Sequence, residues 1–325
     1  MHVLVTGGCG FIGSNLVEFH LAKGDEVSVV DDLSTGSLDN IRPFQTNHKF
    51  HFEQADILHW ENMQKAVAKA DRIYHMSAVI GMYRVLAEPV KVLATNILGC
   101  EKLLHAIARS KSRPQVIIPS SSSVYGHSKS PVMNENLDLV IMSAAYPLKN
   151  YALSKIVTEA LAGAYFHKYQ IPVTIVRLFN TIGPRQSGQY GMVVPRFVKQ
   201  ACRGEPITVF GDGTQTRSFC DVRDAINAVN LLADRSENNG EIVNVGRDKE
   251  ISINELAKLV CKLANSKSEI QYVPYIKAYG EELVDIKQRR PDLTKLYKLT
   301  GFKHQWTLEQ TIENLICDYK PMNKT

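Results

Sequence analysis

Short apolar runs rich in β-branched residues recur along the chain and predict seven strands. They lie at Val3–Val5, Val27–Val30, Phe50–Phe52, Arg72–Tyr74, Val116–Ile118, Val173–Val176 and Ile242–Val245. Amphipathic stretches that predict helices separate most of them, for example Phe11–Lys23, Pro89–Arg109, Tyr151–Tyr169 and Asp221–Leu232. Near-continuous apolar strands followed by helices indicate a parallel sheet that is buried on both faces. The pattern therefore predicts an α/β fold with a Rossmann-type, doubly wound parallel sheet.

The regular alternation of strands and helices breaks down from about residue 180 to residue 220. The glycines that interrupt it are Gly183, Gly188, Gly191, Gly204, Gly211 and Gly213. We expect this stretch and Tyr272–Arg290 to be rich in loops, whereas Ser252–Ala264 and Thr307–Tyr319 have helical patterns. We therefore predict a dinucleotide-binding domain over residues 1–178, to which 221–247 returns. Residues 179–220 and 248–325 would form a smaller, partly discontinuous C-terminal substrate lobe.

The composition favours a soluble cytoplasmic enzyme. A net charge of +5, from 38 basic and 33 acidic side chains along 325 residues, is too weak and too interspersed to predict nucleic-acid binding. No apolar run approaches the ~18 residues of a membrane span. The first strand begins at His2, so we expect no secretory leader. The six cysteines lack C-x-x-C spacing, which favours reduced thiols over a disulfide framework or a zinc site.

A glycine-rich turn follows the first strand. Glycine at positions 7, 10 and 13 permits a tight turn, a close approach to a pyrophosphate, and packing of the next helix on the strand. Asp31 ends the second strand, where its carboxylate would accept both ribose hydroxyls of NAD, and together with Asp32 it would repel a 2′-phosphate. The pattern predicts NAD in preference to NADP. Purely structural glycines and an aspartate that caps a turn are the alternatives.

Tyr151 and Lys155 stand four residues apart in a predicted helix, so their side chains share a face. An ammonium held about 4 Å from the phenol at an effective dielectric near 20 contributes about 4 kcal/mol, roughly three pKa units. Lys155 would thereby make Tyr151 acidic enough to exchange a proton with a sugar hydroxyl. A serine of the Ser120–Ser123 cluster could share that proton. An accidental surface pair and a polar strand end are the alternatives.

Taken together, these segments resemble the extended short-chain dehydrogenase/reductases, specifically the NAD-dependent nucleotide-sugar epimerases and dehydratases. The segments that carry the resemblance are Thr6–Gly13, Asp31–Gly36, Asp56-Ile57, Tyr74–Ala78, Thr95-Asn96, Ser120–Gly126, Tyr151–Lys155, Arg177–Arg185 and Phe210–Arg217. The resemblance implies that NAD contacts Gly7, Gly10, Phe11, Ile12, Gly13, Asp31, Asp32, Ser34, Thr35, Gly36, Asp56, Ile57, Ser77, Ala78, Asn96, Ser120, Tyr151 and Lys155.

The resemblance also implies the rest of the site. Ser121 would be the catalytic hydroxyl beside Tyr151 and Lys155. A nucleotide diphosphate-sugar would be held by Asn180, Val194, Arg217 and Arg289. Arg185, helped by Ser122 and Ser123, could bind a C6 carboxylate in a bidentate manner, although a structural arginine after Gly-Pro would look the same. Uridine is the expected base by analogy, and hexose, N-acetylhexosamine and hexuronate all stay open.

Two positions after Ser121 separate the reactions of the family. The dehydratases carry an Asp-Glu pair there and the UDP-glucuronate decarboxylases typically carry a Glu at the second position, whereas this chain has Ser122 and Ser123. We therefore predict 4-epimerisation of a UDP-sugar through a transient 4-keto intermediate, with Tyr151 as acid and base. The alternatives are a UDP-glucuronate decarboxylase, or another lyase or reductase on the same scaffold, and a non-catalytic NAD-binding regulator.

The resemblance further implies a homodimer. Family members commonly pair two helices into a four-helix bundle, which here would be those around residues 89–109 and 147–169. Both stretches carry apolar residues on more than one face, among them Leu93, Ile97, Leu161 and Tyr165. A fully covered core helix would have the same composition.

Overall fold

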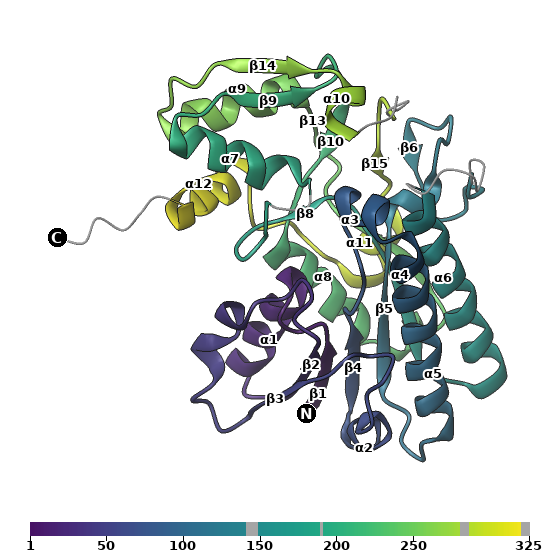
Figure 1. Ribbon diagram of the computed structural model, residues 1–325. Helices are drawn as coiled ribbons and strands as arrows, with labels where there is room; N and C mark the ends of the chain where they lie inside the picture. The colour runs from purple at the N-terminus through teal and green to yellow at the C-terminus, as the bar shows by residue number, and fades with distance from the viewer. Residues whose placement is uncertain (141–148, 189–190, 280–285, 320–325) are drawn as a thin grey trace.

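The computed structural model describes residues 1–140, 149–188, 191–279 and 286–319. Its centre is a parallel sheet of seven strands in the order β12-β7-β5-β4-β1-β2-β3 (Figure 1). The strands are β1 (His2–Thr6), β2 (Glu26–Asp31), β3 (Phe50–Gln54), β4 (Arg72–His75), β5 (Gln115–Ser121), β7 (Val173–Leu178) and β12 (Ile242–Val245). All seven predicted strands are present, and the predicted doubly wound parallel sheet is confirmed.

Helices cover both faces of this sheet. One hydrophobic cluster joins it to α1 (Phe11–Ala22), α8 (Val222–Ala233) and α11 (Thr294–Thr300). A second cluster joins the opposite face to α2 (Met63–Lys69), α5 (Gly99–Arg109) and α6 (Asn150–Tyr169). Within β1, Val3 and Val5 belong to the first cluster and Leu4 to the second. Because successive strand residues point to opposite faces, burial of both faces explains the uninterrupted apolar runs.

A smaller lobe has a hydrophobic cluster of its own. The cluster lies between α7 (Val193–Arg203), α9 (Ile253–Ala264) and α12 (Leu308–Tyr319). Two strand pairs complete the lobe, β9 (Ile207–Phe210) parallel to β14 (Ile270–Val273) and β10 (Thr216–Ser218) antiparallel to β13 (Glu250–Ser252). A Ser252/Glu255 capping box starts α9. By contrast, α11, although late in the chain, packs on α8 and β12 of the main sheet.

Helix α7 lies within the stretch that the glycines led us to expect as loops, so that expectation is wrong there. Gly204 ends the helix with a left-handed φ of +67°, a conformation that favours glycine at a helix C-terminus. It therefore marks a boundary of the helix. In the second stretch predicted as loops, α10 (Tyr275–Tyr279) forms one short helix.

Shorter elements connect the two parts. They are α3 (Met82–Ala87), α4 (Pro89–Leu93), the strand pair β8 (Thr181–Ile182) with β11 (Cys220–Asp221), and the pair β6 (Val132–Met133) with β15 (Arg290–Pro291). A π-helical segment at Ala94–Leu98 links α4 to α5. The stretch predicted as one α-helix over Pro89–Arg109 is therefore interrupted there.

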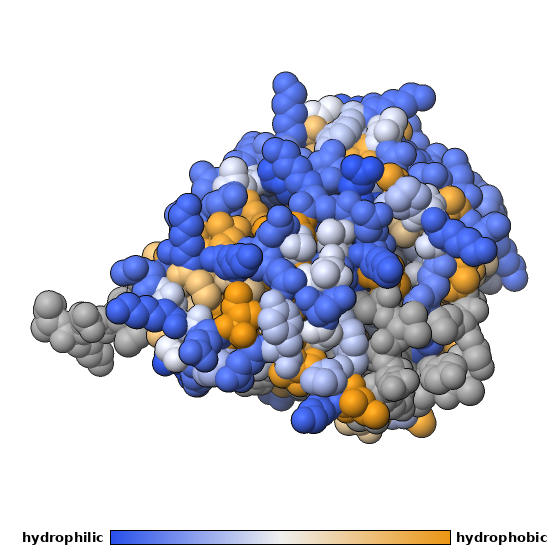
Figure 2. Space-filling view, turned by 90° about the horizontal axis from the view of Figure 1, so that it is seen from above, coloured by the Kyte–Doolittle hydropathy of each residue, from blue (hydrophilic) through white to orange (hydrophobic). Residues whose placement is uncertain are grey.

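In Figure 1 the smaller lobe lies above the carboxyl ends of the sheet strands. Seen from above, this side of the molecule is mainly hydrophilic, with hydrophobic residues in small separate groups (Figure 2). None of the helices in the described ranges is long and apolar enough to cross a membrane.

Candidate active site

A cavity of about 1380 Å³ opens at the carboxyl ends of the central strands, bounded by the smaller lobe. It includes the point where the strand order reverses, between β1 and β4, which is where open α/β sheets bind their ligands. With the exception of Asn96, every residue predicted to bind the cofactor or the substrate or to act in catalysis lines this cavity. The fold therefore brings together segments that lie far apart in the sequence.

The glycine turn has the shape that a dinucleotide diphosphate requires. Gly7 has a φ of +70°, and a Cβ there would lie 2.6 Å from the backbone nitrogen of Ser77. A Cβ on Gly13 would lie 2.2 Å from the carbonyl oxygen of Gly7. Gly10 is the N-cap of α1, and no side chain caps that end of the helix. The N–H groups of the first turn therefore face the cavity without a competing side chain, so the turn fits an anion such as the NAD diphosphate.

Asp31 lines the cavity, and its carboxylate is also hydrogen-bonded to the protein backbone. Its carboxylate accepts hydrogen bonds from the backbone N–H groups of Cys9, at 2.9 Å, and Leu33, at 2.8 Å. Burial raises the pKa of Asp31, and these two bonds oppose the rise. A carboxylate has about four acceptor positions, so it can fix the glycine turn and still accept a ribose hydroxyl.

Tyr151 and Lys155 lie on the first two turns of α6. The ammonium of Lys155 donates to the carbonyl oxygen of Pro119 at 2.8 Å, and it lies 5.9 Å from the centre of the Tyr151 ring. Burial raises the pKa of Tyr151 to about 12, opposed by a hydrogen bond with Ser121, and burial lowers the pKa of Lys155 to about 8. Burial in the protein therefore favours the neutral phenol, and the lowering of its pKa by Lys155 stays a prediction.

Asn96 is buried beside the cavity and is hydrogen-bonded within the protein. Its side-chain oxygen accepts from the N–H of Val79 at 2.7 Å, and its amide nitrogen donates to Ser154 Oγ at 3.0 Å. Only 2% of the residue is exposed, and it does not line the cavity. Asn96 therefore ties the loop after β4 to α6, and its predicted contact with NAD stays a prediction.

The serine cluster presents hydroxyls to the cavity. Ser121 ends β5 and accepts from the N–H of Ser123 at 3.2 Å, which starts the short helical turn Ser122–Tyr125. The hydroxyl oxygens of Ser120 and Ser123 are buried and have no hydrogen-bond partner among the described residues. Because such groups are costly to leave unpaired, they are suited to bind a polar ligand.

At the opposite end of the cavity, the predicted substrate residues already have protein contacts. Asn180 donates to the carbonyl of Ser218 at 2.8 Å, and Arg217 donates to the carbonyls of Thr216 and Ile286 at 2.7 and 2.8 Å. The side chains of Val194 and Arg289 also line the cavity. These residues form the wall on the side of the smaller lobe.

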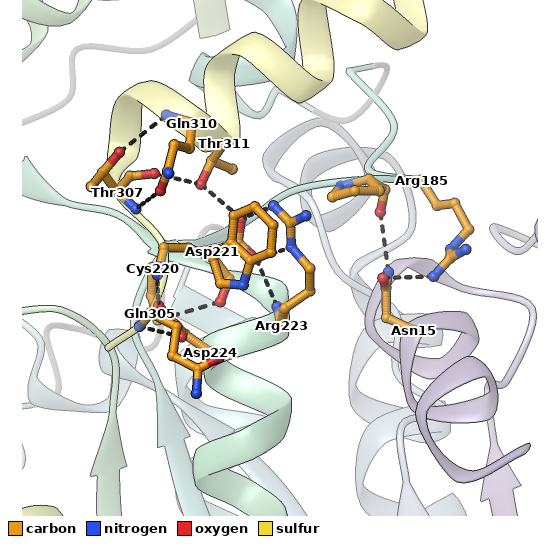
Figure 3. A network of polar contacts seen from close by, with 12 residues as sticks. Asn15, Arg185, Cys220, Asp221, Arg223, Asp224, Gln305, Thr307, Gln310 and Thr311 are labelled. Carbon is orange, nitrogen blue, oxygen red and sulfur yellow. Dashed lines mark hydrogen bonds and ion pairs between the residues drawn. The ribbon is translucent and has the colours of Figure 1, made fainter. Parts of the chain in front are cut away.

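Arg185, predicted to bind a C6 carboxylate, is hydrogen-bonded to residues of α1. One of its nitrogens donates to Asn15 Oδ1 at 2.6 Å (Figure 3). The same nitrogen donates to Glu18 Oε2, also at 2.6 Å. Both partners lie on α1, so Arg185 ties its loop to the dinucleotide side of the cavity. Glu18 would compete with a C6 carboxylate for this guanidinium, and the structural alternative therefore describes the arrangement better.

Several residues of the cavity wall were not predicted from the sequence. The Arg196 guanidinium of α7 stacks on the ring of Phe210, 3.7 Å from its centre, and Tyr275 of α10 lies on the same wall. His127 and Lys149 approach one another at 3.4 Å near the serine cluster. Phe210 opens one of the segments that carry the family resemblance, but no spacing pattern in the sequence identifies the others.

Helix α12, which brings Asp318 to the cavity, is anchored by a polar network at the start of α8 (Figure 3). Asp221 accepts from the N–H of Arg223 at 2.8 Å and pairs with its guanidinium at 2.6 Å. The hydroxyl of Thr311 donates to the same carboxylate at 2.7 Å. Burial raises the pKa of Asp318, whereas Arg185 and Arg223 oppose the rise.

Five aspartates among the described residues line the cavity, and all of them lie far from the serine cluster in the sequence. They are Asp31, Asp32, Asp39, Asp56 and Asp318. The segment Ser120–His127 contributes hydroxyls, an imidazole and backbone groups, but no carboxyl group. This distinguishes it from the dehydratase pattern.

Comparisons with known proteins agree with this geometry. Residues 3–246 match the NAD dependent epimerase/dehydratase family. UDP-N-acetyl-alpha-D-glucosaminuronate decarboxylase of Bacillus cytotoxicus is 34% identical over 322 residues, which cover 96% of each protein. UDP-glucuronic acid decarboxylase 1 of Danio rerio is 32% identical and covers 97% of this chain and 71% of its own length.

A solved structure gives the same picture. UDP-glucuronic acid 4-epimerase from Bacillus cereus, in complex with UDP-glucuronic acid and NAD, superposes with a TM-score of 0.87 at 28% identity, covering 98% of both chains. The family match spans most of the chain, and the glycine turn and its helix fit the dinucleotide. The chain therefore belongs to the NAD-dependent epimerase/dehydratase family, with NAD as its cofactor.

Proposed function

We propose that this enzyme catalyses the NAD-dependent 4-epimerisation of a UDP-sugar. The observation that carries the proposal is the presence of Ser122 and Ser123 beside Ser121, where a dehydratase needs its acid and base. Elimination of water requires a positioned proton donor, and the serine segment supplies no carboxyl group. Epimerisation needs only removal of hydride at C4, rotation of the keto sugar, and return of hydride to the other face.

The residues of α6 and β5 divide the proton chemistry between them. NAD held by the glycine turn and Asp31 would supply a store for the hydride, so that the reaction would show no net redox change. Tyr151 takes the C4 hydroxyl proton and gives it back, while Ser121, hydrogen-bonded to it, orients the phenol. Because burial alone favours the neutral phenol, Tyr151 depends on the positive charges of Lys155 and of the oxidised nicotinamide ring to act as a base.

Decarboxylation of a UDP-uronate is the second candidate, since two relatives that cover nearly all of this chain are named as decarboxylases. Oxidation at C4 of a uronate makes a β-keto acid, which loses carbon dioxide from C6 to leave an enolate that takes up a proton at C5. No leaving group has to be protonated, unlike in the elimination of water. The serines therefore argue against dehydration more strongly than against this reaction. Both candidates share the same first step at Tyr151.

The products distinguish the candidates. Purified enzyme is incubated separately with UDP-glucose, UDP-N-acetylglucosamine and UDP-glucuronate, and the products are resolved by NMR. We expect the C4 epimer of at least one substrate, with no accumulation of NADH. Release of carbon dioxide with formation of a UDP-pentose would replace this proposal with the decarboxylase. No product from the panel would favour a non-catalytic NAD-binding protein.

A Tyr151→Phe variant is the control for the mechanism. It removes one hydroxyl and preserves the ring, so we expect unfolding in urea to change little and kcat to fall by about a thousandfold or more, the upper part of the range for a general acid–base group. Full activity of this variant would refute the role of the phenol whichever product is formed.

Homodimer formation is part of the proposal. Val90 of α4 is 79% exposed and Leu98, just before α5, is 51% exposed, so two aliphatic side chains of this stretch face solvent. Tyr165 of α6 donates to Glu101 of α5 at 2.9 Å, so the two helices form one surface. A second copy that packs against this surface would cover these residues. Residues 147 and 148 of the predicted pairing region lie outside the described residues.

A further inference from the structure

A buried ion pair lies one helical turn beyond the predicted catalytic pair. Glu159 follows Lys155 by four residues on α6, and only 6% of its side chain is exposed. Its two oxygens accept hydrogen bonds from Nε and Nη2 of Arg177 on β7, at 2.9 and 2.8 Å. Tyr151, Lys155 and Glu159 thus succeed one another at the spacing that places side chains on one face of a helix.

Arg177 is itself fixed by the sheet. It stands in register with Ser120 of β5 on one side and Asn244 of β12 on the other. Its guanidinium lies 4.8 Å from the centre of the Tyr125 ring, and Nη1 donates to the carbonyl of Glu135 at 3.3 Å. The carboxylate of Glu159 is therefore held against a rigid partner, and a bidentate pair of this kind also fixes its orientation.

The charged and titratable groups that act on Lys155 come from three elements. They are His75 on β4, Cys100 on α5, and Glu159 on α6 itself. Burial keeps the imidazole neutral, because it lowers the pKa of His75 to about 3, and it keeps the thiol neutral by raising the pKa of Cys100 to about 12. Glu159, whose carboxylate is ion-paired with Arg177, is therefore the member of this set that supplies a negative charge.

Burial lowers the pKa of Lys155 to about 8, and the negative charges of Cys100, when ionised, and of Glu159 oppose this. With the thiol neutral, the opposing charge at neutral pH comes from Glu159. A lysine whose pKa lies so close to neutrality would lose part of its charge if that carboxylate were removed.

We propose that Glu159 is a positioning residue whose carboxylate keeps Lys155 in its ammonium form beside Tyr151, with Arg177 holding the carboxylate in place. The proposal rests on the proposed function, in which Tyr151 needs a positive charge nearby. The structural alternative is that the ion pair only joins α6 to the sheet. That role predicts a loss of stability without a change in the titration of Lys155.

Matched variants separate the two roles. Glu159→Gln removes the negative charge and keeps the shape of the side chain. Arg177→Lys disturbs the bidentate geometry but keeps both charges. We expect Glu159→Gln to move the alkaline limb of the kcat–pH profile about one pH unit lower, Arg177→Lys to leave it in place, and Glu159→Asp to restore the wild-type limb.

A direct titration provides a readout that does not depend on turnover. The pKa of Lys155 is followed by NMR in protein labelled with [ε-13C]lysine, with the signal assigned through Lys155→Met. We expect it to be about one unit lower in Glu159→Gln than in the wild type. If Glu159→Gln fails to fold, the double variant Glu159→Gln/Arg177→Gln replaces the ion pair by two neutral amides that can bond to each other. A smaller shift in the same direction is then expected, because the positive charge of Arg177 is removed as well.

An unchanged Lys155 pKa in Glu159→Gln, or in the double variant, would overturn the inference and leave Glu159 a structural residue. A shift of the same size in Arg177→Lys would also overturn it, since charge would then not be the cause. The proposed function fails by a different observation, the absence of product from the wild-type enzyme. The lysine titration decides the role of Glu159 in either case.

Discussion

At the scale of single residues, burial sets the charge states around the cavity. The same desolvation that raises the pKa of Tyr151 and lowers that of Lys155 keeps the imidazole of His75 neutral. His75 is 4% exposed, and its Nδ1 lies 2.9 Å from the hydroxyl of Thr6, immediately before the glycine turn. The neutral ring therefore helps to join the ends of β1 and β4.

His75 should make the protein less stable in acid. Its pKa is lowered to about 3 in the folded state, whereas a histidine in an unfolded chain titrates near 6.5. Between these values the unfolded state binds more protons, so the free energy of unfolding falls as the pH drops below about 6.5. By pH 5.5 the contribution of one such group is about 1.4 kcal/mol.

Urea unfolding at pH 7.5 and pH 5.5 tests this prediction. The stability lost between the two pH values should be smaller in His75→Asn than in the wild type by about 1.4 kcal/mol. His105→Asn on α5, where the side chain is exposed, serves as the control and should retain the wild-type loss. Equal losses in wild type and His75→Asn would mean that the imidazole is not held neutral.

At the scale of elements, two glycines in helices have opposite surroundings. Gly13 lies in the first turn of α1, where a Cβ would be 2.2 Å from the carbonyl oxygen of Gly7. Gly163 lies within α6, and a Cβ there would meet nothing within 4 Å. The first glycine is required by a close backbone contact that also shapes the dinucleotide turn, and the second is not.

Substitution by alanine should therefore have opposite effects at the two positions. Gly163→Ala should raise the free energy of unfolding by about 0.5–1 kcal/mol, because alanine is the better helix former. Gly13→Ala should lower it and weaken NAD binding, because a backbone oxygen cannot move aside as a side chain can. Urea unfolding and NADH fluorescence titration measure both effects. An unaltered NAD affinity in Gly13→Ala would contradict the role given to this turn.

At the scale of the whole molecule, Val90 and Leu98 are the exposed aliphatic side chains of the surface that α4 and α5 form, the surface proposed for the homodimer. Val90→Glu combined with Leu98→Glu places two charges on it, which should convert the proposed homodimer to a monomer. Light scattering after size-exclusion chromatography gives the mass directly. Ile276→Glu on α10, which is 53% exposed in the smaller lobe, is the matched control and should leave the dimer intact. A monomeric wild-type protein would refute the proposal.

Local sequence patterns were sufficient for the sheet and for most of the cavity. The strands were predictable because burial on both faces leaves an apolar run such as Val3–Val5. The glycine turn, Asp31 and the Tyr151/Lys155 spacing were recognisable because each depends on residues near one another in the chain. Helix α7 escaped prediction because its flanking glycines look the same whether they end a helix or belong to a loop.

What the sequence by itself determined was the family, the cofactor and the absence of a carboxyl group beside Ser121, since these depend on residue types at short spacings. The tertiary structure decided which groups meet across long separations. In the folded chain Asn96 is hydrogen-bonded to Val79 and Ser154, and Arg185 is hydrogen-bonded to Asn15 and Glu18. It also joined Glu159 to Arg177. A side chain's partners and its pKa depend on desolvation and on the charges that folding brings together. The spacing of residues along the chain determines neither of these.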